Sequence, residues 1–137
     1  MINSVNVNIQ DVLADRNIVF DTDRVRTRAC GCGGSIEHDN GSGVFTLKKP
    51  GIYKVDFNAN VTATAAGDVT LAIQSNGETV AGTEMDYVVT VADDYQNVSA
   101  STLIVIQPYS SKTISVANIS AIDVSVDDAN IIITRIA

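Results

Sequence analysis

The sequence predicts an all-β protein folded as a two-sheet sandwich, and three observations support that prediction. The 137-residue chain is 45% hydrophobic but only 5% aromatic, and much of its apolar content is Val, Ile and Ala. The β-branched residues in this set suit a pleated, half-buried surface. Apolar and polar residues alternate with period two in several segments, while helical periodicity is nearly absent. Turn residues divide the chain into about ten short strands, a spacing typical of a sandwich or barrel.

The N-terminal segment carries the first alternating pattern. Residues 3–9 place Val5, Val7 and Ile9 on one face of a strand and asparagines on the other. The following residues, 10–17, have the composition for at most one helical turn.

A long strand follows the Pro50-Gly51 turn and alternates over residues 51–64. Tyr53, Val55 and Phe57 share one face, and we expect them in the core. Polar residues between them form a solvated face, as in an antiparallel sheet with one wet side. These outward positions are Lys54, Asp56, Asn58 and Asn60.

Three further turns are expected towards the C-terminus. Asn76-Gly77 is the strongest short-range hairpin signal, because both residues tolerate positive φ. Residues 108–111 separate two apolar segments, and a turn over residues 127–130 is expected before the closing strand.

Two runs, residues 103–106 and 131–133, are apolar on both faces. A strand of a single two-sheet sandwich should show one polar face, so a neighbouring subunit is the simplest cover for the second apolar face. Ile131, Ile132 and Ile133 are therefore the tentative interface residues. From the residues alone, the number of subunits is more than one.

The charge pattern argues against nucleic acid and membranes as partners. The net charge is −7, and residues 57–137 carry only Lys112 and Arg135 as basic residues against nine acidic ones. An acidic domain repels polyanions. The one basic run, residues 24–28, is short and has no interleaved aromatic residues.

The only cysteines, Cys30 and Cys32, precede the only histidine, His38, in a Gly-rich stretch flanked by arginines. Four interpretations remain open. Reduced thiols in a Gly-rich connection are favoured, ahead of an intermolecular disulfide. A zinc site completed on a threefold axis is a weaker alternative, because one chain offers only three soft ligands. A Cys30–Cys32 disulfide would close a very small ring.

Motifs for catalysis and cofactors are absent from the sequence. His38 has no nucleophile pattern such as G-x-S-x-G, and no glycine-rich phosphate loop opens a helix. The pairs Asp93-Asp94 and Asp127-Asp128 are candidate calcium ligands, although Asp is common in turns without metal. We therefore expect no enzyme activity and no cofactor.

The order of these segments resembles the jelly-roll domains of complement component one-q heads and of tumour necrosis factor. The resemblance covers residues 43–137. It is carried by "GVFTLKKPGIYKVDFNANV", with its Pro-Gly turn and Gly-x-Tyr strand, and by "VTLAIQSNGETV" with its Asn-Gly hairpin. The apolar closing segment "ANIIITRIA" is similar to that of bacterial and phage members and departs from the Phe-x-Gly ending of complement heads. Residues 1–42 match less well.

The resemblance implies one domain over residues 1–137, a ten-stranded jelly roll that forms a homotrimer and binds other surfaces without catalysis. We expect a virion structural protein that decorates a phage capsid or caps a fibre, with a capsid, tail or host surface as partner. The alternative is a bacterial cell-surface or carbohydrate-binding module, disfavoured by the few aromatics and the absence of Trp. No secretory pattern follows Met1, so we expect synthesis in the host cytoplasm and a final place in the virion.

Overall fold

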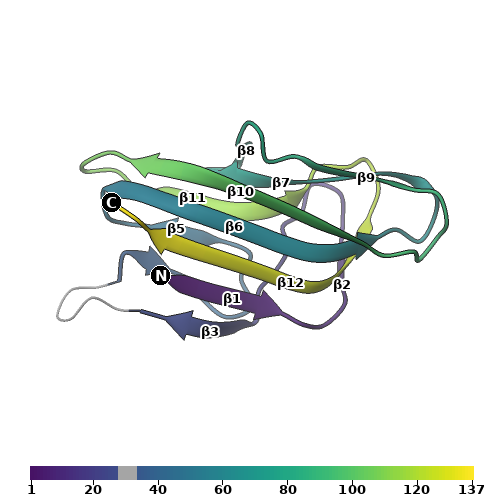
Figure 1. The fold of residues 1–137 in the computed structure, drawn as a ribbon, viewed down its shortest axis with the longest axis horizontal. Helices are drawn as coiled ribbons and strands as arrows, with labels where there is room; N and C mark the ends of the chain where they lie inside the picture. Colours follow the sequence, from purple (N-terminus) through teal and green to yellow (C-terminus); the bar gives the residue numbers. More distant parts are fainter. Residues whose placement is uncertain (28–33) are drawn as a thin grey trace.

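The computed structural model describes residues 1–27 and 34–137 and folds them into two antiparallel sheets that face each other (Figure 1). The predicted sandwich is confirmed, with twelve strands in the described residues instead of about ten. The larger number arises because segments of two or three residues pair beside longer strands. Residues 10–17 form one such short strand and a tight turn, and no helix in the described ranges is long and apolar enough to cross a membrane.

The first sheet, nearer the viewer in Figure 1, has the strand order β10-β6-β12-β1-β3, with β2 beside β12. Its two longest strands, β6 and β12, pair antiparallel at its centre. The N-terminal strand β1 pairs with the C-terminal strand β12, so the first and last residues of the chain lie on neighbouring strands. The bounds are β1 Ile2–Asn6, β2 Gln10–Val12, β3 Thr22–Arg26, β6 Gly51–Thr62, β10 Gln96–Ile106 and β12 Val124–Arg135.

The second sheet has the order β4-β5-β11-β7-β8, with β9 beside β7. The strands β7 and β8 form a hairpin whose turn residues, Asn76 and Gly77, have φ of 53° and 80°. This is the backbone expected for the Asn-Gly signal. The bounds are β4 Ile36–Glu37, β5 Phe45–Leu47, β7 Gly67–Ser75, β8 Glu78–Thr79, β9 Met85–Val89 and β11 Lys112–Asn118.

The core lies between the sheets and is built by the inward faces of their strands. Along β6 the burial alternates, as the sequence predicts. Tyr53 and Val55 are fully buried and Phe57 is 2% exposed, so all three residues lie in the core. Phe20 packs edge-on against both Phe45 and Phe57, which closes the core between the two sheets.

The expected turn at residues 127–130 is instead a β-bulge inside β12, which runs without interruption from Val124 to Arg135. Asp127 pairs with Asn60, and Asn130 pairs with Asn58, so β12 has one more residue than β6 across this step. Asp128 takes φ of 51° there. Asp tolerates this conformation, which explains why a turn-like composition occurs within a strand.

The N-terminal strand β1 ends at Asn6, and its inward side chains are Ile2, Ser4 and Asn6. The alternating valines do not continue as a buried face, because Val7 and Ile9 are 61% and 62% exposed. Polar inward side chains are tolerated here because they have partners. Asn6 donates to the Val19 carbonyl, and Ser4 donates to Asp23.

Candidate functional site

The outer face of the first sheet carries apolar side chains that no element within residues 1–27 and 34–137 covers. Leu103 and Val105 on β10 are 57% and 47% exposed, while Ile104 and Ile106, between and after them, are buried. The residue pairs Val105↔Ile52 and Asp56↔Ile132 place β10, β6 and β12 side chains side by side. Ile136 donates its amide to the Ile52 carbonyl and so extends the same row. We call this set the apolar strip: Val25, Ile52, Leu103, Val105, Ile132 and Ile136.

Three polar contacts within the chain lie beside the apolar strip. Ser101 Oγ donates to Asp56 at 2.6 Å, and Lys54 Nζ lies 3.3 Å from the same carboxylate. Asn3 donates to Asn130 Oδ1 at 2.6 Å. A partner that covers this face therefore meets apolar surface and polar groups that already have hydrogen-bond partners, which lowers the cost of burying them.

The three tentative interface isoleucines separate into two sets. Ile131 and Ile133 are fully buried and face the second sheet, so their side chains belong to the core of their own chain. Ile132 points to the outer face and is half-buried. Of the three isoleucines, only Ile132 therefore remains a candidate interface residue. Its neighbours across the sheet are Asp56 on β6 and Asn3 on β1.

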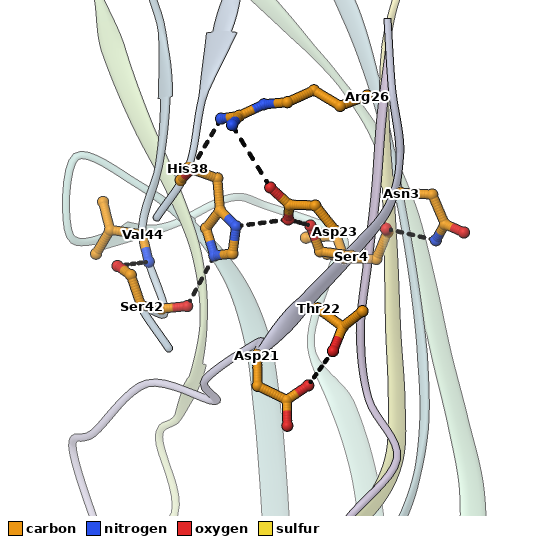
Figure 2. A network of polar contacts seen from close by, with 10 residues as sticks. Asn3, Ser4, Asp21, Thr22, Asp23, Arg26, His38, Ser42 and Val44 are labelled. Atoms are coloured by element: carbon orange, nitrogen blue, oxygen red, sulfur yellow. Dashed lines mark hydrogen bonds and ion pairs between the residues drawn. The ribbon is translucent and has the colours of Figure 1, made fainter. Parts of the chain in front are cut away.

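His38 forms a second site, a buried polar clamp between β3 and the segment that follows β4 (Figure 2). Its imidazole is fully buried, with Nδ1 2.8 Å from the Asp23 carboxylate and Nε2 2.9 Å from the Ser42 carbonyl. Arg26 donates to the His38 carbonyl at 2.8 Å. Because Asp23 and Arg26 come from the first sheet and His38 precedes β5 of the second, these contacts tie the two sheets together.

Both nitrogens of the His38 ring have polar partners in the clamp, the Asp23 carboxylate and the Ser42 carbonyl. The ring also stacks on Phe45, with centroids 4.1 Å apart and planes 11° apart. The His38 side chain is therefore held by three neighbours in the described part of the chain.

Cys30 and Cys32 lie outside the described residues, so the interpretations that involve them are not tested. Within residues 1–27 and 34–137, no group of three or more His, Cys, Asp or Glu side chains is placed to hold a metal ion. Both nitrogens of His38, the third residue of that candidate metal set, have polar partners in the described part of the chain.

The acidic pairs lie at the end of the molecule opposite the chain termini. Asp93 has φ of 61° in the β9–β10 loop, and Asp128 occupies the β12 bulge, so backbone geometry accounts for both residue types. Burial raises the pKa of Tyr95 in this region, and the carboxylates of Asp127, Asp93 and Asp11 raise it further. The region is therefore strongly negative.

The strand order and the two facing antiparallel sheets define a jelly-roll sandwich of the complement one-q and tumour necrosis factor type. The globular domain of zebrafish complement 1qA superimposes with a TM-score of 0.71 at 11% identity, covering 99% of this chain and 96% of that one. Murine APRIL at pH 5.0 gives 0.70 at 13%, covering 98% and 97%. Eiger TNF from S. frugiperda gives 0.70 at 10%, covering 99% and 92%.

The comparisons show the fold alone, because these identities are low. No protein-family model and no curated protein matches the chain. The structural match includes residues 1–42, which the sequence resemblance did not cover. The family resemblance is weaker there because the inward face of β1 is partly polar, with Ser4 and Asn6 beside Ile2.

Sequence reasoning missed the clamp and part of the apolar strip. Asp23 and His38 are 15 residues apart and share no recognisable motif. Val25 lies between two arginines and Ile52 between Gly51 and Tyr53. Strand pairing alone places Ile52 beside Val105, and Val25 opposite Asn3, which separates it from Ile132. The run at residues 103–106, which is apolar on both faces, is the sequence feature that predicts part of the strip.

Proposed function

We propose that this protein is a non-enzymatic virion module that assembles as a homotrimer through the outer face of its first sheet. The observation that carries the proposal is the apolar strip. Leu103, Val105 and Ile136 are each about half exposed on one contiguous sheet face, with values of 57%, 47% and 53%. Covering such surface is favourable by about 25 cal/mol per Å².

A second copy is the occupant that fits this face. The strip lies on the outer face of a sheet, and polar side chains beside it, Ser101 with Asp56 and Asn3 with Asn130, are hydrogen-bonded within the chain. Repetition of one contact around an axis gives a closed ring. The number three comes from the resemblance to complement one-q and tumour necrosis factor domains, whose fold this chain shares.

The virion role is supported by sequence features. The apolar closing segment, residues 129–137, resembles that of phage and bacterial members of the family. A carbohydrate-binding or cell-surface module is the second candidate, and the seven aromatic residues and absence of Trp argue against its sugar-binding form. A clamp that uses both nitrogens of His38 supports a structural role for the only histidine.

A matched pair of substitutions tests the assembly surface. Leu103→Asp places a carboxylate in the strip, and Val88→Asp places one at a similarly exposed position of β9, 60% exposed in the other sheet. We expect Leu103→Asp to give folded single chains in light scattering, while Val88→Asp remains assembled. Equal behaviour of the two variants would rule out the strip as the interface.

The virion role is tested on particles. Antibodies against the purified protein should label particles released from cells that express the gene, at regular positions in electron micrographs. Protein found only on intact cell surfaces would support the second candidate and contradict the virion role. Flanking capsid or tail genes would give independent support.

A further inference from the structure

The charges of this chain are separated along the long axis of the molecule. The β5–β6 turn, the β10–β11 turn and both chain termini lie at one end in Figure 1, and the β6–β7 turn and β9–β10 loop lie at the other. The first end, the basic end, carries Lys48, Lys49, Lys112 and Arg135. The second end, the acidic end, carries Asp68, Asp93, Asp94, Asp127 and Asp128.

Local contacts hold the basic end together. Lys112 pairs with Leu47 across β5 and β11, which places it beside Lys48 and Lys49. Arg135 donates to the Pro50 carbonyl through Nε at 3.1 Å and through a terminal nitrogen at 2.6 Å. Its guanidinium is thereby fixed next to Lys49, with its charge unpaired by a carboxylate.

Most charges at both ends have no salt-bridge partner among the residues that the structure describes. Lys48 is paired with Glu37 at 2.6 Å. Over residues 1–27 and 34–137, no carboxylate lies within salt-bridge distance of Lys49, Lys112 or Arg135. Residues 28–33 contain no Asp or Glu that could supply one. The same four salt bridges include no carboxylate of the acidic end.

We infer that the basic end docks on the acidic end of a second assembly, so that assemblies stack head to tail along their long axis. The inference rests on the proposed self-association, because parallel protomers around an axis gather their basic ends on one face and their acidic ends on the opposite face. The anionic surface that complements the basic end is thus present on the same chain. Asp127 and Asp93, which raise the pKa of Tyr95 in addition to burial, belong to this surface.

Screening allows such a contact despite the net charge of −7. The 12-residue strands β6 and β12 span about 40 Å at roughly 3.3 Å per residue. The Debye length is about 10 Å in 0.1 M salt, so stacked copies respond to the two facing ends and much less to their distant like charges. Tyr109, fully exposed in the turn before Lys112, adds an aromatic contact of the kind enriched at interfaces.

A head-to-tail contact is heterologous, and repetition of it gives open stacks. The unmodified protein should therefore show masses that rise in steps of one whole assembly in about 0.1 M salt and return to a single assembly in about 1 M salt. The mass in high salt also reports the lateral assembly itself. A single-chain mass in high salt would contradict the proposed trimer. An assembly that stays intact but does not stack in low salt would contradict only the head-to-tail contact.

Two charge-reversal variants test the polarity of the contact. Lys49→Glu with Lys112→Glu makes both ends acidic, and Asp68→Lys with Asp94→Lys makes the acidic end more basic. Neither variant should stack alone, and an equimolar mixture should restore stacking. Asp68→Lys with Asp94→Lys adds four positive charges to a chain of net charge −7, so this variant stays negative. Both variants are then negative overall, and attraction between their net charges cannot explain renewed stacking in the mixture.

Single substitutions give the matched control. Lys112→Glu and Arg16→Glu change the net charge equally, but the carbonyl of the exposed Arg16 accepts from the Asn118 amide, at the opposite end of β11 from Lys112. Light scattering should show loss of stacking for Lys112→Glu only. Loss in both, stacking of the doubly acidic variant, or no recovery in the mixture would overturn the inference.

Discussion

At the residue scale, alternation in a strand decides which side chains carry stability. In β6 the inward residues are essentially unexposed, and their neighbours face the outer side. The same rule predicted the core positions Tyr53, Val55 and Phe57 from sequence, because an amphipathic strand needs no knowledge of its partners. It could not predict the clamp, since the Asp23–His38 contact depends on how the two sheets approach each other.

Adjacent substitutions in β6 should differ in their effect on stability. Phe57→Ala removes an aromatic side chain that is 2% exposed and packed against Phe20, and it should lower the free energy of unfolding by about 3–5 kcal/mol. Asn58→Ala, on the outer side, should change it by less than about 0.5 kcal/mol. Urea titration measures both values, and similar losses would mean that the faces are misassigned.

The clamp should contribute to stability through Asp23, whose carboxylate contacts both the buried His38 Nδ1 and the Ser4 hydroxyl. Asp23→Ala leaves these two groups without that partner and should lower the free energy of unfolding by about 1–3 kcal/mol. Asp39→Ala, at an exposed neighbouring position, is the control and should cost under about 0.5 kcal/mol. Urea titration measures both values, and equal losses would contradict the structural role of the clamp.

The raised pKa of Tyr95 leads to a prediction for the stability of the protein at alkaline pH. Its pKa is raised by burial and then by Asp127, Asp93 and Asp11, so folding favours the neutral phenol. The stabilising effect is therefore complete below the ordinary Tyr pKa of about 10 and is lost as pH rises through the higher folded value. Tyr95→Phe should remove this loss in stability measurements above that pH. An unchanged alkaline slope in the variant would refute the assignment.

At the element scale, strand pairing explains features that the sequence presents ambiguously. Residues 127–130 have turn composition, but β12 continues through them because both flanking segments pair with β6. A bulge and a turn use the same residue types, so composition alone cannot separate them. In the same way, "III" was recognised as apolar on both faces, but only pairing shows that Ile131 and Ile133 face the core.

The Pro-Gly turn before β6 depends on the closing strand. Gly51 has φ of 144°, and a Cβ there would contact the Ala137 carbonyl and lie 2.7 Å from Arg135 Nε. Gly51→Ala should therefore cost at least about 2 kcal/mol more than Gly77→Ala, whose φ is 80° but whose Cβ would meet open space. Thermal unfolding of the two variants provides the comparison. Equal losses would show that the C-terminal residues do not close over this turn.

At the scale of the whole molecule, the apolar strip on the outer face of the first sheet is left uncovered in the described part of the chain. Its inner faces form one continuous core, so the outer strip around Ile132 and Leu103 has no partner in the described part of the chain. The fold class followed from periodicity and turn chemistry, because these are local properties. The extent of the strip could not be predicted from the sequence, since β3, β1, β12, β6 and β10 come together only through long-range pairing.

The mass of the unmodified protein in solution tests the central claim most directly. Light scattering at micromolar concentration in high salt, where end-to-end contacts are screened, measures the lateral assembly alone. We expect the mass of three 14.5 kDa chains for the unmodified protein and the mass of one folded chain for Leu103→Asp. A mass of one chain would contradict self-association through the apolar strip, and a dimer would contradict the threefold assembly.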